Sequence, residues 1–256
     1  MKILLLDYGY IELVKPNGVW GSDEAIIEAA RMSTNKGFLG WGPKHKDDCA
    51  CVGKTPPLQS DCTCGELVAG DEKLLAYLWN NKHRTPFEMA GMVIEVKAPI
   101  MVFREWHRHR TQSYNEMSAR YIPLPDENYM PDTDRVGFLG RTLGNKQASG
   151  LREGVMEIED VQTFRDELKA LYVQAQTVYE LGLKLGVPKE LARLSVPVAR
   201  YSKMRACANL RNWLAFLTLR MAPTAQWEIR QYANAVGQIV ANQFPRTWEL
   251  FNAESK

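Results

Sequence analysis

The feature that most constrains the fold is a change in the spacing of apolar residues along the chain. Residues 2–7 and 10–14 are short runs rich in Ile, Leu, Val and Tyr, and residues 92–97 show the period-two alternation of a strand. In the last third, apolar residues recur at helical intervals and predict helices near 160–185, 189–196, 203–220 and 225–243. Early strands and late helices predict an α+β fold, with helices packed on one face of a sheet.

The N-terminal half contains further helices and one long irregular stretch. Ser22 followed by Asp23 predicts a helix start, and helical spacing continues to Met32. Helices are also predicted over 72–80 and 100–110. Between the first helix and the one over 72–80, residues 36–70 are dominated by Gly, Pro, Lys, Asp and Cys, which is typical of an insertion. A chain of 256 residues is therefore expected to form a single domain, residues 1–256, that carries this insertion.

Charge and hydropathy argue against two broad classes of function. The formal net charge is only +2 over the whole chain, which is too small to predict a nucleic-acid or membrane surface. The first apolar run is too short for a signal peptide, and no stretch approaches the roughly 20 apolar residues of a membrane span. We expect a cytoplasmic protein without a nucleic-acid or membrane partner, whose cysteines are reduced.

One short segment concentrates basic and polar side chains. Residues 104–120 contain four arginines and two of the four histidines of the chain. Because a guanidinium donates two parallel hydrogen bonds to a phosphate, the segment predicts a site for a phosphorylated small molecule. Ser113 and Glu116 have capping-box spacing, which predicts a helix beginning near Tyr114. From the residues alone, a solvated helix face and a surface pair between Glu116 and Arg120 explain the same charges.

The order of residues within this segment carries a family resemblance. Arg108-His109-Arg110 is followed by Ser118, and residues 113–120 read Ser-Tyr-Asn-Glu-Met-Ser-Ala-Arg. This order resembles the signature of the flavin-dependent thymidylate synthases, the ThyX family. The likeness extends through residues 83–88 and 225–229, whereas 36–70 and 130–150 lack clear counterparts. It implies a ThyX-like fold with a central, mostly antiparallel sheet flanked by helices and a helix-rich C-terminal third.

The resemblance also implies a reaction and a set of partners. Members of the family methylate dUMP to dTMP, with methylenetetrahydrofolate as carbon donor and FAD reduced by NADPH as hydride donor. No enzyme nucleophile attacks the pyrimidine, so Ser118 is implied to be a dUMP ligand and not a catalytic serine. The family is homotetrameric and builds its sites between subunits, so the implied residues need not converge within one chain.

Individual residues are assigned from the resemblance, position by position. Arg220 is implied to be the catalytic cation, because a cation beside the uracil favours ionisation at N3. The implied dUMP ligands are Arg108, Glu116, Met117, Ser118, Ala119, Arg120, Arg193 and Arg220. The implied FAD ligands are Ser33, Thr85, Arg108, His109, Arg110, Glu116, Asn209, Arg211 and Leu219. His83 is implied to line the approach of the folate and of NADPH.

Two positions depart from the family pattern. Glu105 stands where a Gln that helps to hold dUMP is common, and a carboxylate repels a phosphate. We therefore expect Glu105 to point away from the phosphate or to contact the base, and we leave it out of the site. Ala215 stands where an Asn or His often contacts the flavin, so one hydrogen bond is lost there, worth ~1 kcal/mol.

Four of the five cysteines are clustered in the insertion. Cys49, Cys51, Cys62 and Cys64 could supply four thiolates to a structural zinc ion, which would stabilise a segment that has few apolar residues. Free thiols in a loop, or disulfides in an oxidising environment, explain the same pattern.

Two other functions remain open at this point. One is a catalytically inactive homologue that keeps the flavin and nucleotide pocket, although the intact Arg-His-Arg, Ser118 and Arg220 argue against decay. The other is an RNA-binding module that uses the basic segment, which the near-neutral net charge and the single short patch disfavour.

Overall fold

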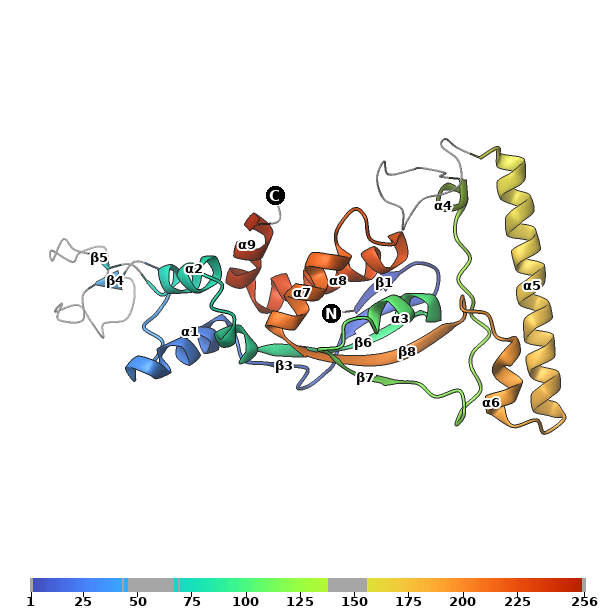
Figure 1. Ribbon diagram of the computed structural model, residues 1–256, viewed down its shortest axis with the longest axis horizontal. Coiled ribbons are helices and arrows are strands. Elements are labelled where there is room, and N and C mark those ends of the chain that lie inside the picture. The colour runs from blue at the N-terminus through green and yellow to red at the C-terminus, as the bar shows by residue number, and fades with distance from the viewer. Residues whose placement is uncertain (1, 43, 46–66, 69, 138–155, 255–256) are drawn as a thin grey trace. The chain divides into compact units, whose positions relative to one another are not determined.

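The computed structural model describes residues 2–42, 44–45, 67–68, 70–137 and 156–254, whose helices and strands are labelled in Figure 1. The chain divides into two compact units. The sheet unit comprises Met1–Gly18, Val93–Ala208 and Ala215–Ile239. The helical unit comprises Val19–Met92, Asn209–Leu214 and Val240–Lys256. The expectation of one catalytic domain over residues 1–256 stays a prediction.

The main sheet is mostly antiparallel, as predicted. Its strand order is β1 (Lys2–Leu5), β2 (Gly9–Leu13), β6 (Gly91–Pro99), β8 (Tyr201–Asn209) and β7 (Ser113–Glu116), and β3 (Val19–Trp20) pairs with β6. The β1–β2, β2–β6, β3–β6 and β7–β8 ladders are antiparallel. Every second side chain of β6 is fully buried, which confirms the predicted alternation: Met92, Ile94, Val96 and Ala98.

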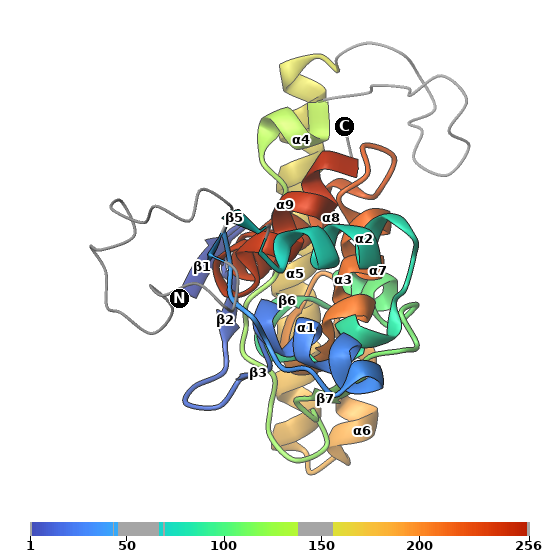
Figure 2. The same ribbon diagram turned by 90° about the vertical axis from the view of Figure 1, so that its left-hand side faces the viewer.

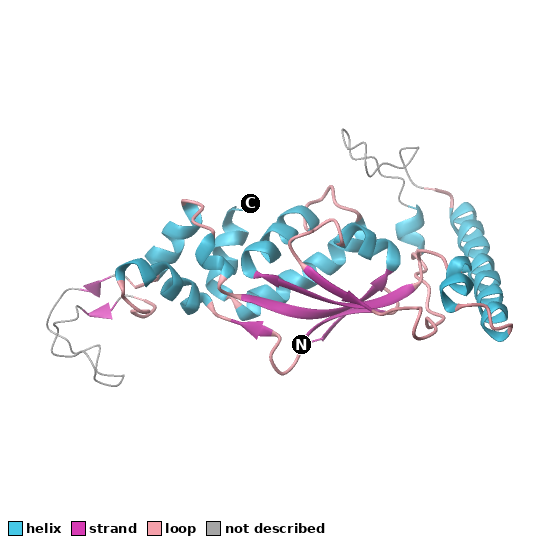
Figure 3. Ribbon diagram, turned by 60° about the horizontal axis from the view of Figure 1, so that its bottom comes forward, coloured by secondary structure: helices cyan, strands magenta, loops and turns pink. Residues whose placement is uncertain are grey.

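Helices pack on this sheet through an aromatic layer. The helices that contribute to the sheet unit are α3 (Ile100–Trp106), α4 (Thr133–Gly137), α5 (Ile158–Lys184), α6 (Lys189–Ala192), the C-terminal part of α7 (Leu210–Arg220) and most of α8 (Trp227–Gln243). Figure 3 shows helices gathered on one face of the strands. Trp106 stacks on Phe216 with 4.6 Å between ring centroids and meets the edge of Tyr232 at 6.4 Å. The hydroxyl of Tyr232 donates to the carbonyl oxygen of Lys97 in β6, at 2.9 Å.

The helical unit is held together by a cap that comes from a distant part of the sequence. Its elements are α1 (Asp23–Arg31), η1 (Met32–Thr34), β4 (Lys44–His45), β5 (Leu67–Val68), α2 (Glu72–Asn80), η3 (Thr85–Glu88) and α9 (Pro245–Glu254). Helices α1, α2 and α9 pack together (Figure 2). The buried Asp23 carboxylate accepts hydrogen bonds from the backbone of Arg246 (2.9 Å) and from the hydroxyl of Thr247 (2.6 Å). An N-terminal residue thereby caps the last helix.

Three local predictions are wrong, and two of these errors lie at the β7–β8 ladder. Residues 113–116 form strand β7 and not a helix start, and residues 203–209, predicted as helix, belong to β8, which includes Cys207. Ser113 pairs with Cys207 and Glu116 with Met204, so each segment takes its conformation from the other. Helix α3 also ends at Trp106, whereas the helical spacing predicted an extension to residue 110.

Candidate functional site

The Arg108–Arg110 segment lies on a tight turn between α3 and β7. The amide of His109 donates to the carbonyl oxygen of Trp106 (3.0 Å), and the amide of Gln112 donates to that of His109 (3.2 Å). The hydroxyl of Tyr114 lies 2.7 Å from the His109 carbonyl oxygen. Buried Trp106 donates its indole N–H to the side-chain oxygen of Gln112 at 3.1 Å. Side chains of both flanking elements, Trp106 of α3 and Tyr114 of β7, therefore hold the turn in place.

The three residues of this turn differ in their surroundings. Arg108 and Arg110 are exposed, and within the described part of the chain neither guanidinium has an ion-pair partner. His109 between them is half-buried, and its ring packs edge-on against Phe216 with 4.9 Å between centroids. Burial, and then the nearby charge of Arg220, lower the pKa of His109 to about 4. The imidazole is consequently neutral at physiological pH.

Arg220, the last residue of α7, is held by this turn and by α3. Its Nε donates to Nε2 of His109 at 2.9 Å, which places the remaining imidazole proton on Nδ1. Its Nη1 donates to Oε2 of Glu105 at 2.9 Å, and its Nη2 donates to the backbone carbonyl oxygen of Glu105 at 3.0 Å. The Arg220 side chain is only 17% exposed. The structure therefore brings together Arg220, implied to be catalytic, His109, an implied flavin ligand, and Glu105, which was left out of the predicted site.

The next predicted ligands form a second turn after β7. The amide of Met117 donates to the carbonyl oxygen of Lys203 at 2.8 Å and so extends the strand pairing by one residue. The Ser118 hydroxyl accepts a hydrogen bond from the amide of Arg120 at 3.3 Å. Ala119 is buried, whereas Arg120 and Glu116 are exposed and do not pair with each other. The turn thus presents a hydroxyl, a carboxylate and a guanidinium within five residues.

Arg193 belongs to a segment that contacts the residues following this second turn. It begins the short 3-10 helix η4 (Arg193–Ser195), which directly follows α6, and its side chain is exposed. Lys189 at the start of α6 donates to the carbonyl oxygen of Tyr121 at 2.7 Å and ties α6 to the signature segment. Glu190, three residues earlier, is exposed as well, and within the described part of the chain it forms no ion pair with Arg193.

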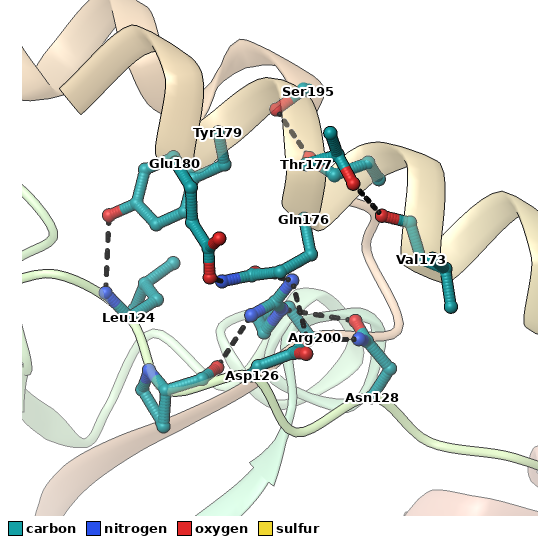
Figure 4. Close-up of polar contacts among 12 residues, drawn as sticks. Leu124, Asp126, Asn128, Val173, Gln176, Thr177, Tyr179, Glu180, Ser195 and Arg200 are labelled. Atoms are coloured by element: carbon teal, nitrogen blue, oxygen red, sulfur yellow. Dashed lines mark hydrogen bonds and ion pairs between the residues drawn. The ribbon is translucent and has the colours of Figure 1, made fainter. Parts of the chain in front are cut away.

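A fully buried arginine anchors the chain that follows the signature (Figure 4). Arg200 donates through Nε to the side-chain oxygen of Asn128 (3.0 Å) and through Nη1 to the carbonyl oxygen of Pro125 (2.6 Å). Its Nη2 donates to the side chain of Gln176 in α5 (2.8 Å) and lies 3.3 Å from a carboxylate oxygen of Asp126. Sequence reasoning missed this residue. The available signal was a single charge within the otherwise uncharged run of residues 194–202.

Replacement of Arg200 by methionine is expected to destabilise the fold by roughly 3 kcal/mol, because it removes three part-buried hydrogen bonds and an ion pair made by a fully buried side chain. Chemical denaturation followed by circular dichroism measures the change. Arg205→Met, on the strand that follows, is the matched control: its side chain is 60% exposed and its guanidinium lies 3.6 Å from Glu95, so its loss costs less than about 1 kcal/mol. Equal stability of the two variants would contradict the role given to Arg200.

The helical unit holds the remaining predicted residues at its surface. Ser33 is exposed in η1, where its hydroxyl donates to the carbonyl oxygen of Ala30 at 3.3 Å. Thr85 opens η3 and is exposed, and the ring of exposed His83 lies 5.7 Å from that of Tyr77.

Near the start of α7, the Asn209 side chain accepts from the amide of Asn212 at 3.0 Å, and exposed Arg211 forms an ion pair with Glu88. Leu219, in the sheet unit, is 61% exposed and is not a core residue.

The described residues offer no place for a metal ion. No group of three or more His, Cys, Asp or Glu side chains in that part of the chain could ligate one. The four clustered cysteines, Cys49, Cys51, Cys62 and Cys64, lie outside the described residues, so the structure gives no support to the zinc prediction. Within the same ranges, no helix has the length and apolar content needed to cross a membrane.

Comparison with known proteins gives consistent matches over almost the whole chain. A profile of the family described as "Thymidylate synthase complementing protein" matches residues 15–246. A flavin-dependent thymidylate synthase of Thermus thermophilus is 36% identical over 251 residues, which cover 98% of this chain and 78% of that protein. The enzyme of the same name from Thermosipho melanesiensis is 34% identical over 254 residues, which cover 98% of this chain and 93% of the relative.

Solved structures agree with these sequence matches. The UMP/dUMP methylase PolB from Streptomyces cacaoi, bound with 5-Br UMP, superposes with a TM-score of 0.73 at 29% identity and covers 97% of this chain and 96% of that one. The same protein bound with 5-Br dUMP gives a TM-score of 0.74 at 32% identity, with 98% and 97% covered. These matches confirm the ThyX-like fold. The chain therefore belongs to the ThyX family, the flavin-dependent nucleotide methyltransferases that include thymidylate synthase.

Proposed function

We propose that this protein is a thymidylate synthase that methylates dUMP to dTMP, with methylenetetrahydrofolate as carbon donor and NADPH-reduced FAD as hydride source. One observation carries the proposal. Arg220 is fixed by His109 and Glu105 beside a turn that presents two exposed guanidinium groups without ion-pair partners among the described residues. A fixed cation next to anion-binding groups suits a substrate that carries a phosphate and develops negative charge on its base.

The described part of the chain offers no activated nucleophile at this place, which suits a mechanism without covalent attachment to the pyrimidine. The hydrogen bond described for the Ser118 hydroxyl comes from a backbone amide, and a serine needs a neighbouring base to become a nucleophile. Burial raises the pKa of the Cys207 thiol and keeps it protonated. We therefore assign Ser118 to dUMP binding, with a set of neighbours around it: Arg108, Glu116, Met117, Ala119, Arg120 and Arg193.

The donor groups near the signature fit a flavin dinucleotide. The diphosphate is an anion, and Arg108 and Arg110 are exposed cations that lack ion-pair partners among the described residues. Nearby, the side-chain nitrogen of Gln112 is buried without a hydrogen-bond partner, and so is Nε2 of His107. These groups could satisfy polar atoms of a bound cofactor. When bound, the flavin supplies the hydride. The proposed flavin ligands are Ser33, Thr85, Arg108, His109, Arg110, Glu116, Asn209, Arg211 and Leu219, and His83 would line the folate and NADPH approach.

Flavin binding gives the first test of the proposal. Purified protein supplied with FAD is expected to absorb as a flavoprotein and to bleach when NADPH is added without oxygen. Binding of dUMP should then change the flavin spectrum measurably, and UMP serves as the comparison because PolB is a UMP/dUMP methylase. Protein that takes up no FAD, or whose bound flavin NADPH does not reduce, would contradict the proposal. Binding of UMP in preference to dUMP would make UMP the substrate.

A homotetramer is part of the same proposal, and helix α5 supports it. Four apolar side chains recur every seven residues along it and its C-cap, and all are exposed: Phe164, Leu171, Val178 and Leu185. A seven-residue spacing keeps side chains on one side of a helix, so these four form an apolar stripe along one face of α5. Such stripes mark association surfaces, because exposed apolar area remains in contact with water unless a partner covers it.

Charges introduced into this stripe are expected to reduce the assembly to smaller species. The double variant Leu171→Glu and Val178→Glu should elute with a lower mass than the wild type in size-exclusion chromatography with light scattering. Gln162→Glu with Lys169→Glu is the matched control, because both residues are exposed, are also seven residues apart on the same helix, and lie on the side opposite the stripe. A wild-type mass of one chain, or an unchanged mass of the stripe variant, would contradict the proposed role of α5.

A further inference from the structure

Glu105 makes an unusual double contact with the arginine at the centre of the proposed site. Its side-chain Oε2 accepts from Nη1 of Arg220, and its own backbone carbonyl oxygen accepts from Nη2 of the same residue. It is the residue before Trp106, whose buried ring fixes the end of α3. One residue on a well-packed helix end therefore holds both terminal nitrogens of Arg220.

These contacts determine the orientation of the Arg220 guanidinium. A guanidinium has five N–H donors in one plane. Three of the five are used, two by Glu105 and one by Nε2 of neutral His109. The plane of the group is thereby fixed, and one N–H on each terminal nitrogen is left for a ligand. The pair with Glu105 joins side chains that are 17% and 40% exposed, so it is partly shielded from water.

The carboxylate contributes more to this arrangement than the other two acceptors. Within the described residues, Glu105 is the acidic group in ion-pair contact with Arg220. A hydrogen bond between charged groups is roughly twice as strong as one between neutral groups. Without the carboxylate, the mostly buried guanidinium would keep only a neutral imidazole and a backbone carbonyl, and its terminal nitrogens could rotate away from their present direction.

We propose that Glu105 is a positioning residue that acts through Arg220: it orients the guanidinium toward the pyrimidine and does not itself bind the substrate. This inference rests on the proposed function, because it concerns the reaction that Arg220 would assist. The proposed role also explains how the Glu105 carboxylate can lie close to a proposed phosphate site without repelling the phosphate. The negative charge is directed at Arg220, within hydrogen-bond distance, and not at the exposed Arg108 and Arg110.

The test is a double-mutant cycle with kinetic and spectroscopic readouts. Glu105→Ala in the holoenzyme is expected to lower kcat for tritium release from dUMP by about tenfold and to change KM for dUMP by less than about threefold, because misorientation affects the transition state most. Glu105→Gln keeps an acceptor oxygen but loses the charge, and should recover part of the loss. In an Arg220→Ala background, Glu105→Ala should have no further effect on kcat, since the two residues act as one unit. Glu249→Ala, an exposed position on α9, is the control.

A readout without turnover separates orientation from general damage. The fluorine chemical shift of 5-fluoro-dUMP bound to the enzyme reports the charge next to the pyrimidine. It is expected to move in Glu105→Ala and in Arg220→Ala in the same direction, and to move less in Glu105→Gln than in Glu105→Ala. Thermal melting of each variant checks that the fold is intact, and Glu105→Gln provides the comparison if the alanine variant unfolds.

Three results would overturn the inference. The first is an equal loss of kcat from Glu105→Ala with and without Arg220, and the second is a rise in KM at constant kcat, which would make Glu105 a direct ligand. The third is a Glu105→Gln variant as impaired as Glu105→Ala. Failure of the proposed function would look different: the wild type itself would release no tritium from dUMP, whatever residue stands at position 105.

Discussion

Replacing Arg220 with alanine is expected to lower kcat for dTMP formation by about 10²–10³-fold. A fixed cation in a partly buried site stabilises the charge that develops on the pyrimidine, and removal of one such preorganised group typically has an effect of this size. Arg220 is 17% exposed and held by three hydrogen bonds, so its orientation is set before a substrate arrives. Single-turnover tritium release at saturating dUMP measures the chemical step without the contribution of product release.

The control for this prediction is another arginine of the same unit. Arg230 in α8 donates to the carbonyl oxygen of Pro223 at 2.9 Å and, within the described part of the chain, is not among the hydrogen-bond partners of Arg220. Its replacement by alanine should change kcat by less than about twofold, within the range expected for a surface substitution. Turnover of Arg220→Ala within about threefold of the wild type, with an unchanged melting temperature, would refute the catalytic assignment.

Arg108→Ala is expected to weaken binding of dUMP by about 10–100-fold, with the loss confined to ligands that carry a phosphate. The exposed Arg108 guanidinium is free of ion pairs within the described residues, so it can give two parallel hydrogen bonds to a phosphate without breaking an existing ion pair. Charge-assisted hydrogen bonds contribute roughly 1.5–3 kcal/mol, which corresponds to that range of affinity. Isothermal titration with dUMP measures the change.

Deoxyuridine, which lacks the phosphate, is the matched ligand for this experiment. Wild type and Arg108→Ala should bind it equally weakly, because the contact that distinguishes them is absent. FAD content is measured in the same preparations, since Arg108 is also proposed to hold the flavin. An unchanged dUMP affinity, or an equal loss for dUMP and deoxyuridine, would be inconsistent with phosphate recognition by this side chain.

The elements that could be predicted are those with a strong local pattern. Strand β6 alternates buried and less buried residues along its length, and α8 places Tyr232, Val236 and Ile239 on one buried face. Both patterns arise because one side of the element faces the core, so apolar residues recur at a fixed interval within the element itself. Ser22 accepts from the amide of Ala25 at 3.2 Å, so the start of α1 is likewise a local signal.

The errors arose where the deciding partner is far away in the sequence. Residues 203–209 contain Lys, Met, Arg and Ala, which favour helices, yet they pair with residues 113–116 as an extended strand. In β8 the exposed Lys203 and Arg205 alternate with buried Met204 and Ala206, a period-two signal that was outweighed by propensity. Helix α9 was missed because its N-terminus is capped by Asp23, more than 200 residues earlier.

The site was predictable only in part for the same reason. The resemblance assigned roles to Arg220 and His109, but their contact joins residues 111 positions apart and is visible only in the folded chain. Glu105 was set aside because a carboxylate repels a phosphate. In the folded chain the carboxylate instead meets Arg220, which lies within hydrogen-bond distance and is 115 positions away in the sequence.

Product formation from labelled dUMP tests the central claim most directly. Holoenzyme supplied with FAD, NADPH, methylenetetrahydrofolate and dUMP tritiated at C5 is expected to release tritium to water and to form dTMP in equal amounts. Omission of any one co-substrate should stop both, and UMP should give far less product. A folded, flavin-loaded protein that binds dUMP but yields neither tritium nor dTMP would contradict the assignment as a thymidylate synthase.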